Sequence, residues 1–322
     1  MQTDVTISRR PGGVRAGVLV LVAIAIGTVA ITISGAGADP NKLTDWQALI
    51  LGVTQGLTEF LPISSSGHLI LVPWLFNWHY LETHSDFNKT FDVSLHLGTL
   101  IAVLAYFRLD AIALAGAWFR SIGKRAIETG EERLAWFVVV ATIPAAIAGA
   151  VGESFVEEKL GQPWQIAILL AVFAIVLWYA DKTPVTRKME EFDLRTAIGV
   201  GCAQALALAP GVSRSGITIS AGRYLGLSRD DAARFSFFLY APVVGGAVVF
   251  KGVKDLHGGF PPGTTGPFIV GTMTSMVVGL VAIWALLSYL RRNNYNVFVI
   301  YRLAIAAAVL ILIATGAKSA HF

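Results

Sequence analysis

Residues Trp46–Leu71 read WQALILGVTQGLTEFLPISSSGHLIL. Most of this stretch is apolar enough to enter a lipid bilayer, yet it carries Gln55, Glu59, three consecutive serines and His68. Ionisable side chains at membrane depth are costly, so they usually face a cavity and mark a functional site. The stretch therefore predicts a functional site inside the membrane.

The helical pattern of the same stretch is interrupted in its middle by Pro62 and Gly67. Irregular backbone is tolerated in a membrane only where protein or a water-filled cavity covers it. We therefore expect a re-entrant hairpin, in which two short helices are joined by a polar loop.

The composition places the whole chain among membrane proteins. Of its 322 residues 55% are hydrophobic and only 14% are charged, against roughly 25% charged in soluble domains. The pI of 9.2 does not indicate nucleic-acid binding, because the basic residues lie in loops between apolar runs. A single cysteine, Cys202, excludes an internal disulfide and a cysteine-based metal cluster.

The first 42 residues are interpreted separately from the domain at 43–322. Three arginines precede an apolar run at 16–34, which Ala36-Gly37-Ala38 follows. This order resembles a cleavable signal peptide, although the run is long enough for an uncleaved signal anchor. Both alternatives place the following residues outside the cytoplasm.

The rest of the chain predicts an all-α polytopic membrane protein. Clusters of basic residues follow alternate apolar spans, and a single topology places all of these clusters on the cytoplasmic side. About six core spans are expected, at residues 91–107, 134–151, 164–180, 235–250, 267–290 and 297–315. Between the third and fourth lies a second broken stretch, 196–227, which we interpret as a second re-entrant hairpin.

A shift of 149 residues lays the second broken stretch on the first. Eight of the 23 positions from Ala48 to Ile70 are then identical, against about one or two expected by chance. The predicted topology inserts the two copies from opposite sides, with repeat halves at about 43–180 and 195–322. Broken helices at matching positions of an inverted repeat point to a site at the bilayer midplane.

The two copies differ in their reactive side chains, which suggests that they are halves of one site. Glu59 corresponds to Leu208, His68 to Ile217 and Ser65 to Arg214. The start of each second half-helix offers N–H groups and hydroxyls to an anion, and Arg214 suits phosphate oxygens. Glu59 would repel a phosphate unless a divalent cation lay between them, and one carboxylate assisted by Gln55 fits Mg²⁺. Ser65 and His68 fit a nucleophile and its acid/base partner.

Two other interpretations compete with an enzyme. Isolated serines, glutamines and arginines in membrane helices often serve only packing. Inverted repeats with broken helices are also a transporter architecture, so a carrier or flippase is the alternative.

Two motifs stand at the breaks of the two stretches: Gln55-Gly-Leu-Thr-Glu59-Phe-Leu-Pro-Ile-Ser-Ser65-Ser-Gly-His68 and Pro210-Gly-Val-Ser213-Arg214-Ser-Gly-Ile-Thr218-Ile-Ser220. They resemble the undecaprenyl-diphosphate phosphatase family that is linked to bacitracin resistance, and the likeness extends from about Leu43 to the C-terminus. The resemblance implies hydrolysis of undecaprenyl diphosphate to undecaprenyl phosphate and inorganic phosphate. That reaction recycles the lipid carrier of cell-wall synthesis and confers bacitracin resistance.

The resemblance also implies roles for individual residues. Ser65, His68 and Glu59 are the expected catalytic residues, with Ser65 as nucleophile and His68 as its acid/base, and attack by His68 itself is the alternative. Glu59 and Gln55 would hold the divalent cation, Mg²⁺ first and Ca²⁺ second, although many family members have a carboxylate at position 55. Phosphate binding is expected from Arg214, Ser213, Ser64, Ser66 and Thr218.

The implied setting is the bacterial inner membrane, with the site open to the periplasmic side. The expected partners are a polyprenyl diphosphate and membrane lipids, and no nucleic acid is expected. The sequence does not decide whether the protein forms a homodimer.

Overall fold

The computed structural model describes residues 43–78, 80–81, 84–256 and 264–321, and these residues form helices without a strand. The predicted signal or anchor segment at 1–42 lies outside the described residues. The α-helices are α2 (Asp45–Phe60), α3 (Ser65–Phe76), α5 (Ser85–Tyr106), α6 (Arg108–Lys124), α7 (Gly130–Lys159), α8 (Pro163–Asp181), α9 (Leu194–Ala205), α10 (Arg214–Tyr224), α11 (Arg229–Leu256), α12 (Thr265–Leu290) and α13 (Asn296–Ala314). Two short 3₁₀ helices, η1 (Met189–Glu191) and η2 (Leu206–Leu208), flank α9.

The helix lengths confirm a polytopic membrane protein. Among the described residues, parts of α7, α8, α11, α12 and α13 are long and apolar enough to cross a bilayer. The bent pair formed by α5 and α6 raises the number of candidate spans from 5 to 6. This agrees with the six core spans expected from the sequence.

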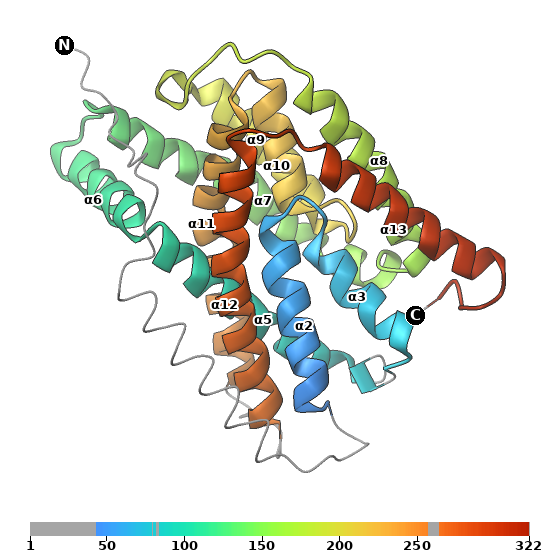
Figure 1. Ribbon diagram of the computed structural model, residues 1–322. Coiled ribbons are helices and arrows are strands. Elements are labelled where there is room, and N and C mark those ends of the chain that lie inside the picture. The colour runs from blue at the N-terminus through green and yellow to red at the C-terminus, as the bar shows by residue number, and fades with distance from the viewer. Residues whose placement is uncertain (1–42, 79, 82–83, 257–263, 322) are drawn as a thin grey trace.

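The segment after the first predicted span differs from the prediction. Residues 108–124 form α6, a helix that turns by 85° from α5, where the sequence suggested a basic loop. Apolar side chains such as Ile112 and Phe119 are exposed on α6 (70% and 67%). The basic residues therefore belong to a helix that extends to one side of the bundle (Figure 1).

The two broken stretches form hairpins whose arms are all short. The first consists of α2 (16 residues) and α3 (12), and the second of α9 (12) and α10 (11). None of the four helices reaches the roughly 20 residues that a spanning helix needs. Leu61, which precedes Pro62, is extended and ends α2, as expected because proline disfavours the helical conformation of the residue before it.

The two hairpin tips have the same backbone conformation at positions that the predicted repeat relates. Ser64 and Ser213, which the shift of 149 residues relates, have φ values of 76° and 74°. Each caps the following helix, because its hydroxyl accepts a hydrogen bond from the N–H of Gly67 or Gly216 respectively. Such backbone conformations are rare outside glycine and persist only where their surroundings hold them. The opposite insertion of the two hairpins stays a prediction.

One arginine from α13 binds both hairpin tips. Arg302 is fully buried, and its guanidinium donates to the carbonyls of Pro62 (3.2 Å), Gly211 (2.9 Å) and Val212 (3.1 Å). A fourth bond joins its Nε to the carbonyl of Leu170 (3.1 Å). Pro62 and Gly211 are themselves related by the 149-residue shift, so Arg302 holds equivalent points of the two loops.

The two tips also contact each other directly. The Gly211 N–H donates to the Ser64 hydroxyl (3.1 Å), and the Ser215 hydroxyl donates to the Leu61 carbonyl (3.0 Å). Segments separated by about half the chain therefore meet inside the protein, as the sequence predicted for the two halves of one site.

Ser64→Ala should lower the free energy of unfolding by about 2–3 kcal/mol, because the caps on Gly67 and Gly211 lose their shared acceptor. Thermal unfolding in detergent measures the change. Ser64→Gly is the matched comparison: it loses the same acceptor but relieves the positive φ, so it should destabilise less than alanine. An unfolding temperature of Ser64→Ala equal to that of the unmodified protein would contradict this assignment.

Candidate active site

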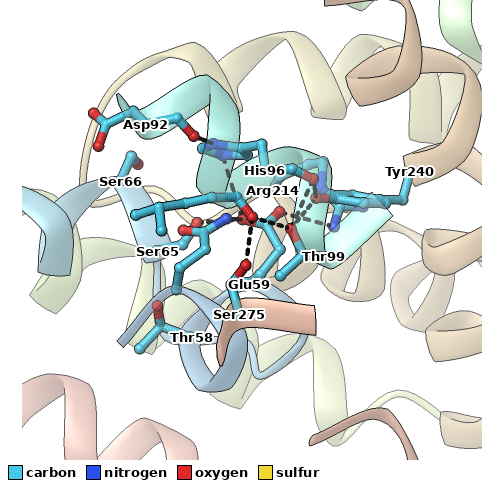
Figure 2. Close-up of polar contacts among 12 residues, drawn as sticks. Thr58, Glu59, Ser65, Ser66, Asp92, His96, Thr99, Arg214, Tyr240 and Ser275 are labelled. Atoms are coloured by element: carbon cyan, nitrogen blue, oxygen red, sulfur yellow. Dashed lines mark hydrogen bonds and ion pairs between the residues drawn. The ribbon is translucent and has the colours of Figure 1, made fainter. Parts of the chain in front are cut away.

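Glu59 lies in the last turn of α2 and is the centre of the polar cluster (Figure 2). Its side chain is almost completely buried, and Oε2 accepts hydrogen bonds from the Ser65 hydroxyl (2.6 Å) and from Gln55 Nε2 (2.9 Å). Gln55 stands one helical turn before Glu59, as their spacing of four predicted. The cluster thus joins the first arm of the hairpin to the serines after its break.

Arg214, the first residue of α10, brings the second hairpin to Glu59. Its Nη2 donates to Glu59 Oε1 (3.2 Å), its Nη1 donates to the Ser236 carbonyl (2.9 Å), and the guanidinium lies over the Tyr240 ring at 4.4 Å. Its Nε is buried and has no hydrogen-bond partner among the described residues. An unsatisfied buried donor in a positively charged group is a natural contact for an anion.

The remaining predicted residues divide into two groups. Ser66 and Ser213 line the same pocket as Glu59, Ser65 and Arg214. Ser64 and Thr218 lie behind it: Ser64 caps α3, and the Thr218 hydroxyl contacts the Arg214 carbonyl (2.8 Å) and the Ser236 hydroxyl (2.7 Å). These two residues therefore support the loop and Arg214 rather than line the pocket.

His68 is not among the pocket-lining residues, in contrast to the expectation that it serves Ser65. Its Nδ1 lies 2.7 Å from the Ser64 carbonyl, and its Nε2 lies 2.8 Å from the Tyr301 hydroxyl. Because a carbonyl only accepts, Nδ1 carries the proton of the neutral ring. Both ring nitrogens are thus engaged behind the loop, where His68 supports the backbone that carries Ser65.

The histidine that lies beside Glu59 is His96, in α5, which the sequence analysis did not single out. Its Nε2 lies 3.6 Å from Glu59 Oε2, and its Nδ1 lies 2.7 Å from the Asp92 carbonyl. Figure 2 shows the imidazole of His96 next to Glu59, while the Asp92 carboxylate points away. The signal for both residues was present in the sequence, because they are ionisable residues four apart in an apolar span.

The pocket above this cluster has a volume of about 430 Å³. Its floor is buried and holds Glu59 and Ser213, and its outer end includes the exposed Lys89. One wall is a stripe of α11 that consists of Val243, Val244, Ala247, Val248 and Lys251. The pocket is thus polar and charged at its floor and apolar along a wall, as an amphiphilic ligand requires.

Two of the predicted residues, Gln55 and Glu59, could supply some of the oxygen ligands of a divalent cation. Gln55 lies behind the pocket lining and directs its Nε2 at Glu59, while its Oε1 is buried without a hydrogen-bond partner among the described residues. Groups of three or more His, Cys, Asp or Glu suited to a metal do not occur in the described part of the chain. An amide oxygen and one carboxylate fit Mg²⁺ where substrate phosphates supply the other ligands.

Comparison with known proteins identifies the family of this chain. Residues 48–308, from α2 into α13, match the family described as bacitracin resistance protein BacA. The chain belongs to this family. The match includes both hairpins, the α5 histidine and Arg302, so the whole site described above lies within it.

Several curated relatives carry the name undecaprenyl-diphosphatase. One from Pelotomaculum thermopropionicum is 46% identical over 273 residues, which are 84% of this chain and 98% of that relative. One from Geobacter sulfurreducens is 46% identical over 265 residues, covering 82% of this chain and 96% of the relative. One from Nocardioides sp. is 44% identical over 276 residues (85% and 98%). These BacA relatives are thus matched over nearly their full length.

Proposed function

We propose that this BacA family member hydrolyses undecaprenyl diphosphate to undecaprenyl phosphate and inorganic phosphate. The observation that carries the proposal is the hydrogen bond of 2.6 Å from the Ser65 hydroxyl to Glu59, whose other oxygen is paired with Arg214. A hydroxyl held against a carboxylate, beside a guanidinium, is the arrangement that nucleophilic attack on a phosphate needs. The name and the near-complete coverage of the relatives support the choice of substrate.

The terminal phosphate is proposed to bind between the two hairpin tips. Arg214 supplies its buried Nε and its fork, and Ser66 and Ser213 supply hydroxyls in the same pocket. The first N–H groups of α3 and α10 have no partner within their helices and favour negative charge. The apolar wall of α11 is suited to the first part of the prenyl chain.

The reaction follows from these positions in two steps. Ser65 Oγ attacks the terminal phosphorus and gives its proton to Glu59 Oε2, while the bond to the bridging oxygen breaks and its electron pair leaves with undecaprenyl phosphate. Water then attacks the phosphoserine, the bond from phosphorus to Oγ breaks, and Oγ recovers the proton from Glu59. Inorganic phosphate leaves with both protons of that water. Glu59 thus takes the acid/base role that the sequence suggested for His68.

Gln55 and Glu59 are the residues that would hold a divalent cation, which would neutralise phosphate charge when bound. If they do, an excess of EDTA should reduce phosphate release by at least about a hundredfold, and added Mg²⁺ should restore it. Release of phosphate by metal-free protein at an unchanged rate would exclude the cation. Thermal unfolding with and without EDTA separates this effect from a loss of folded protein.

The proposal includes the setting implied by the resemblance: the inner membrane, with the pocket open to the periplasmic side. The basic clusters that follow residues 91–107, 164–180 and 267–290 support this orientation: with these clusters inside, the start of α5 and the end of α11 lie on the external side. A homodimer is not needed for the site, because both hairpins come from one chain.

A polyprenyl-phosphate carrier is the alternative function, and one assay distinguishes the two. Purified protein in detergent with undecaprenyl diphosphate should release one inorganic phosphate per lipid and leave undecaprenyl phosphate. A carrier would release none, because transport leaves the phosphoanhydride intact. Absence of both products at any protein concentration would therefore overturn the proposed enzyme.

A further inference from the structure

Gln204 stands out because its position in the pocket is not explained by the roles assigned above. It lies in the last turn of α9, is 2% exposed and lines the same pocket as Ser65 and Arg214. Its Oε1 is buried without a hydrogen-bond partner among the described residues. By the shift of 149 residues, Gln204 is the counterpart of Gln55.

The orientation of the Gln204 amide is held by its neighbours. Its Nε2 donates to the Ala141 carbonyl of α7, a long bond of 3.5 Å. One turn earlier, a Cβ on Gly201 would lie 2.6 Å from the same carbonyl oxygen, so α9 and α7 are in close contact here. With Nε2 directed at Ala141, Oε1 is left as the unpaired acceptor of a residue that lines the pocket.

The kind of group that this acceptor can bind follows from the chemistry of the pocket. Phosphate oxygens in their ionised form accept hydrogen bonds, so they do not satisfy another acceptor. Arg214 and the serine hydroxyls are donors that face the phosphate, and Glu59 already accepts from Ser65. The reactant that brings its own donor into the pocket is the water that hydrolyses the phosphoserine.

We propose that Gln204 is a positioning residue that holds this water, with Oε1 accepting a hydrogen bond from it during the second step. The proposal rests on the two-step reaction described above. Water orientation by a glutamine amide is an established device in phosphoryl transfer, where positioning supplies much of the rate. The water attacks phosphorus and no proton passes to Gln204, so the balance of the step is unchanged.

The test separates the two products in time. For Gln204→Leu, rapid mixing with undecaprenyl diphosphate should give a burst of about one undecaprenyl phosphate per protein, followed by release of inorganic phosphate about ten- to a hundredfold slower than in the unmodified protein. Phosphoserine at residue 65 should then be detectable by mass spectrometry after acid quenching. Gln204→Glu, which keeps an acceptor oxygen, should remove the burst in part. Cys202→Ala, an exposed change on the same helix, should behave as the unmodified protein.

The outcomes are distinct from a failure of the proposed function. If both products slow equally in Gln204→Leu, without a burst or phosphoserine, then Gln204 only packs α9 against α7 and the proposal is wrong. If Gln204→Leu turns over like the unmodified protein, it is wrong as well. A failure of the enzyme itself would instead appear as no phosphate release from the unmodified protein.

Discussion

Ser65→Ala should lower the rate of phosphate release from undecaprenyl diphosphate by about 10⁴- to 10⁶-fold, as removal of a nucleophile does in other hydrolases. The hydroxyl that contacts Glu59 at 2.6 Å is removed, while the fold keeps its other contacts. Binding of the lipid should change little, because Arg214 and the helix N-termini remain. The measurement is steady-state release of inorganic phosphate, together with lipid binding by the inactive variant.

Ser66→Ala is the matched control for this prediction. Ser66 lines the same pocket, but its hydroxyl lies 3.5 Å from that of Ser64 and is not hydrogen-bonded to Glu59 in the described structure. It should therefore keep activity within about tenfold of the unmodified protein. Ser65→Ala with activity comparable to Ser66→Ala would remove Ser65 as nucleophile.

The role of His68 can be tested beside Ser65. His68→Asn keeps a donor near the Ser64 carbonyl and should retain measurable turnover if His68 only supports the loop. Glu59→Gln loses the proton acceptor and should be nearly as inactive as Ser65→Ala. If His68→Asn is as inactive as Ser65→Ala while Glu59→Gln is active, proton transfer belongs to His68 as the sequence first suggested.

Arg214→Ala should cost about 3–4 kcal/mol of transition-state stabilisation, which corresponds to a several-hundredfold lower kcat. The change removes the charge facing the phosphate and also the arginine partner of Glu59 Oε1, and it leaves His96 as the other residue in ion-pair distance of this carboxylate among the described residues. The measurement is the ratio of kcat for the two proteins, with thermal unfolding to confirm that both are folded.

Arg214→Lys distinguishes charge from geometry. A lysine keeps the positive charge, but its donors all lie on one nitrogen and cannot reproduce the planar fork that contacts both Glu59 and the Ser236 carbonyl. Arg214→Lys should recover less than half of the transition-state stabilisation that Arg214→Ala loses. Full recovery would mean that only the charge at position 214 matters, and an Arg214→Ala variant with unchanged kcat would remove this residue from the phosphate site.

The sequence pointed to residues that the structure brings together where a charged residue interrupts an apolar stretch. Glu59 and Arg214 were found because their cost in a membrane demands a partner, and each is the partner of the other. His96 is also an ionisable residue within an apolar span, so the same argument applied to it. Its distance from Glu59 could not be predicted, because spacing along the chain does not give the distance between two helices. Its contact with Glu59 needs the packing of α5 on α2, which only the structure supplies.

For His68, spacing along the chain suggested a contact that the structure does not contain. His68 follows Ser65 by three residues, and this suggested a catalytic pair. The structure begins α3 at Ser65, so His68 lies about 4.5 Å farther along the helix axis, away from the end that faces the pocket. The positive φ of Ser64, which fixes where the helix begins, belongs to a serine and carried no signal in the sequence.

Arg302 has a consequence for how the lipid leaves. Transport by alternating access requires the two repeats to rock past each other around the bound cargo. Here one guanidinium donates to the carbonyls of both loops, and rocking would separate this buried cation from its acceptors in the first half, the carbonyls of Pro62 and Leu170. We therefore expect undecaprenyl phosphate to return to the leaflet from which its diphosphate arrived. Movement of the shortened lipid to the opposite leaflet would then be the task of a different protein.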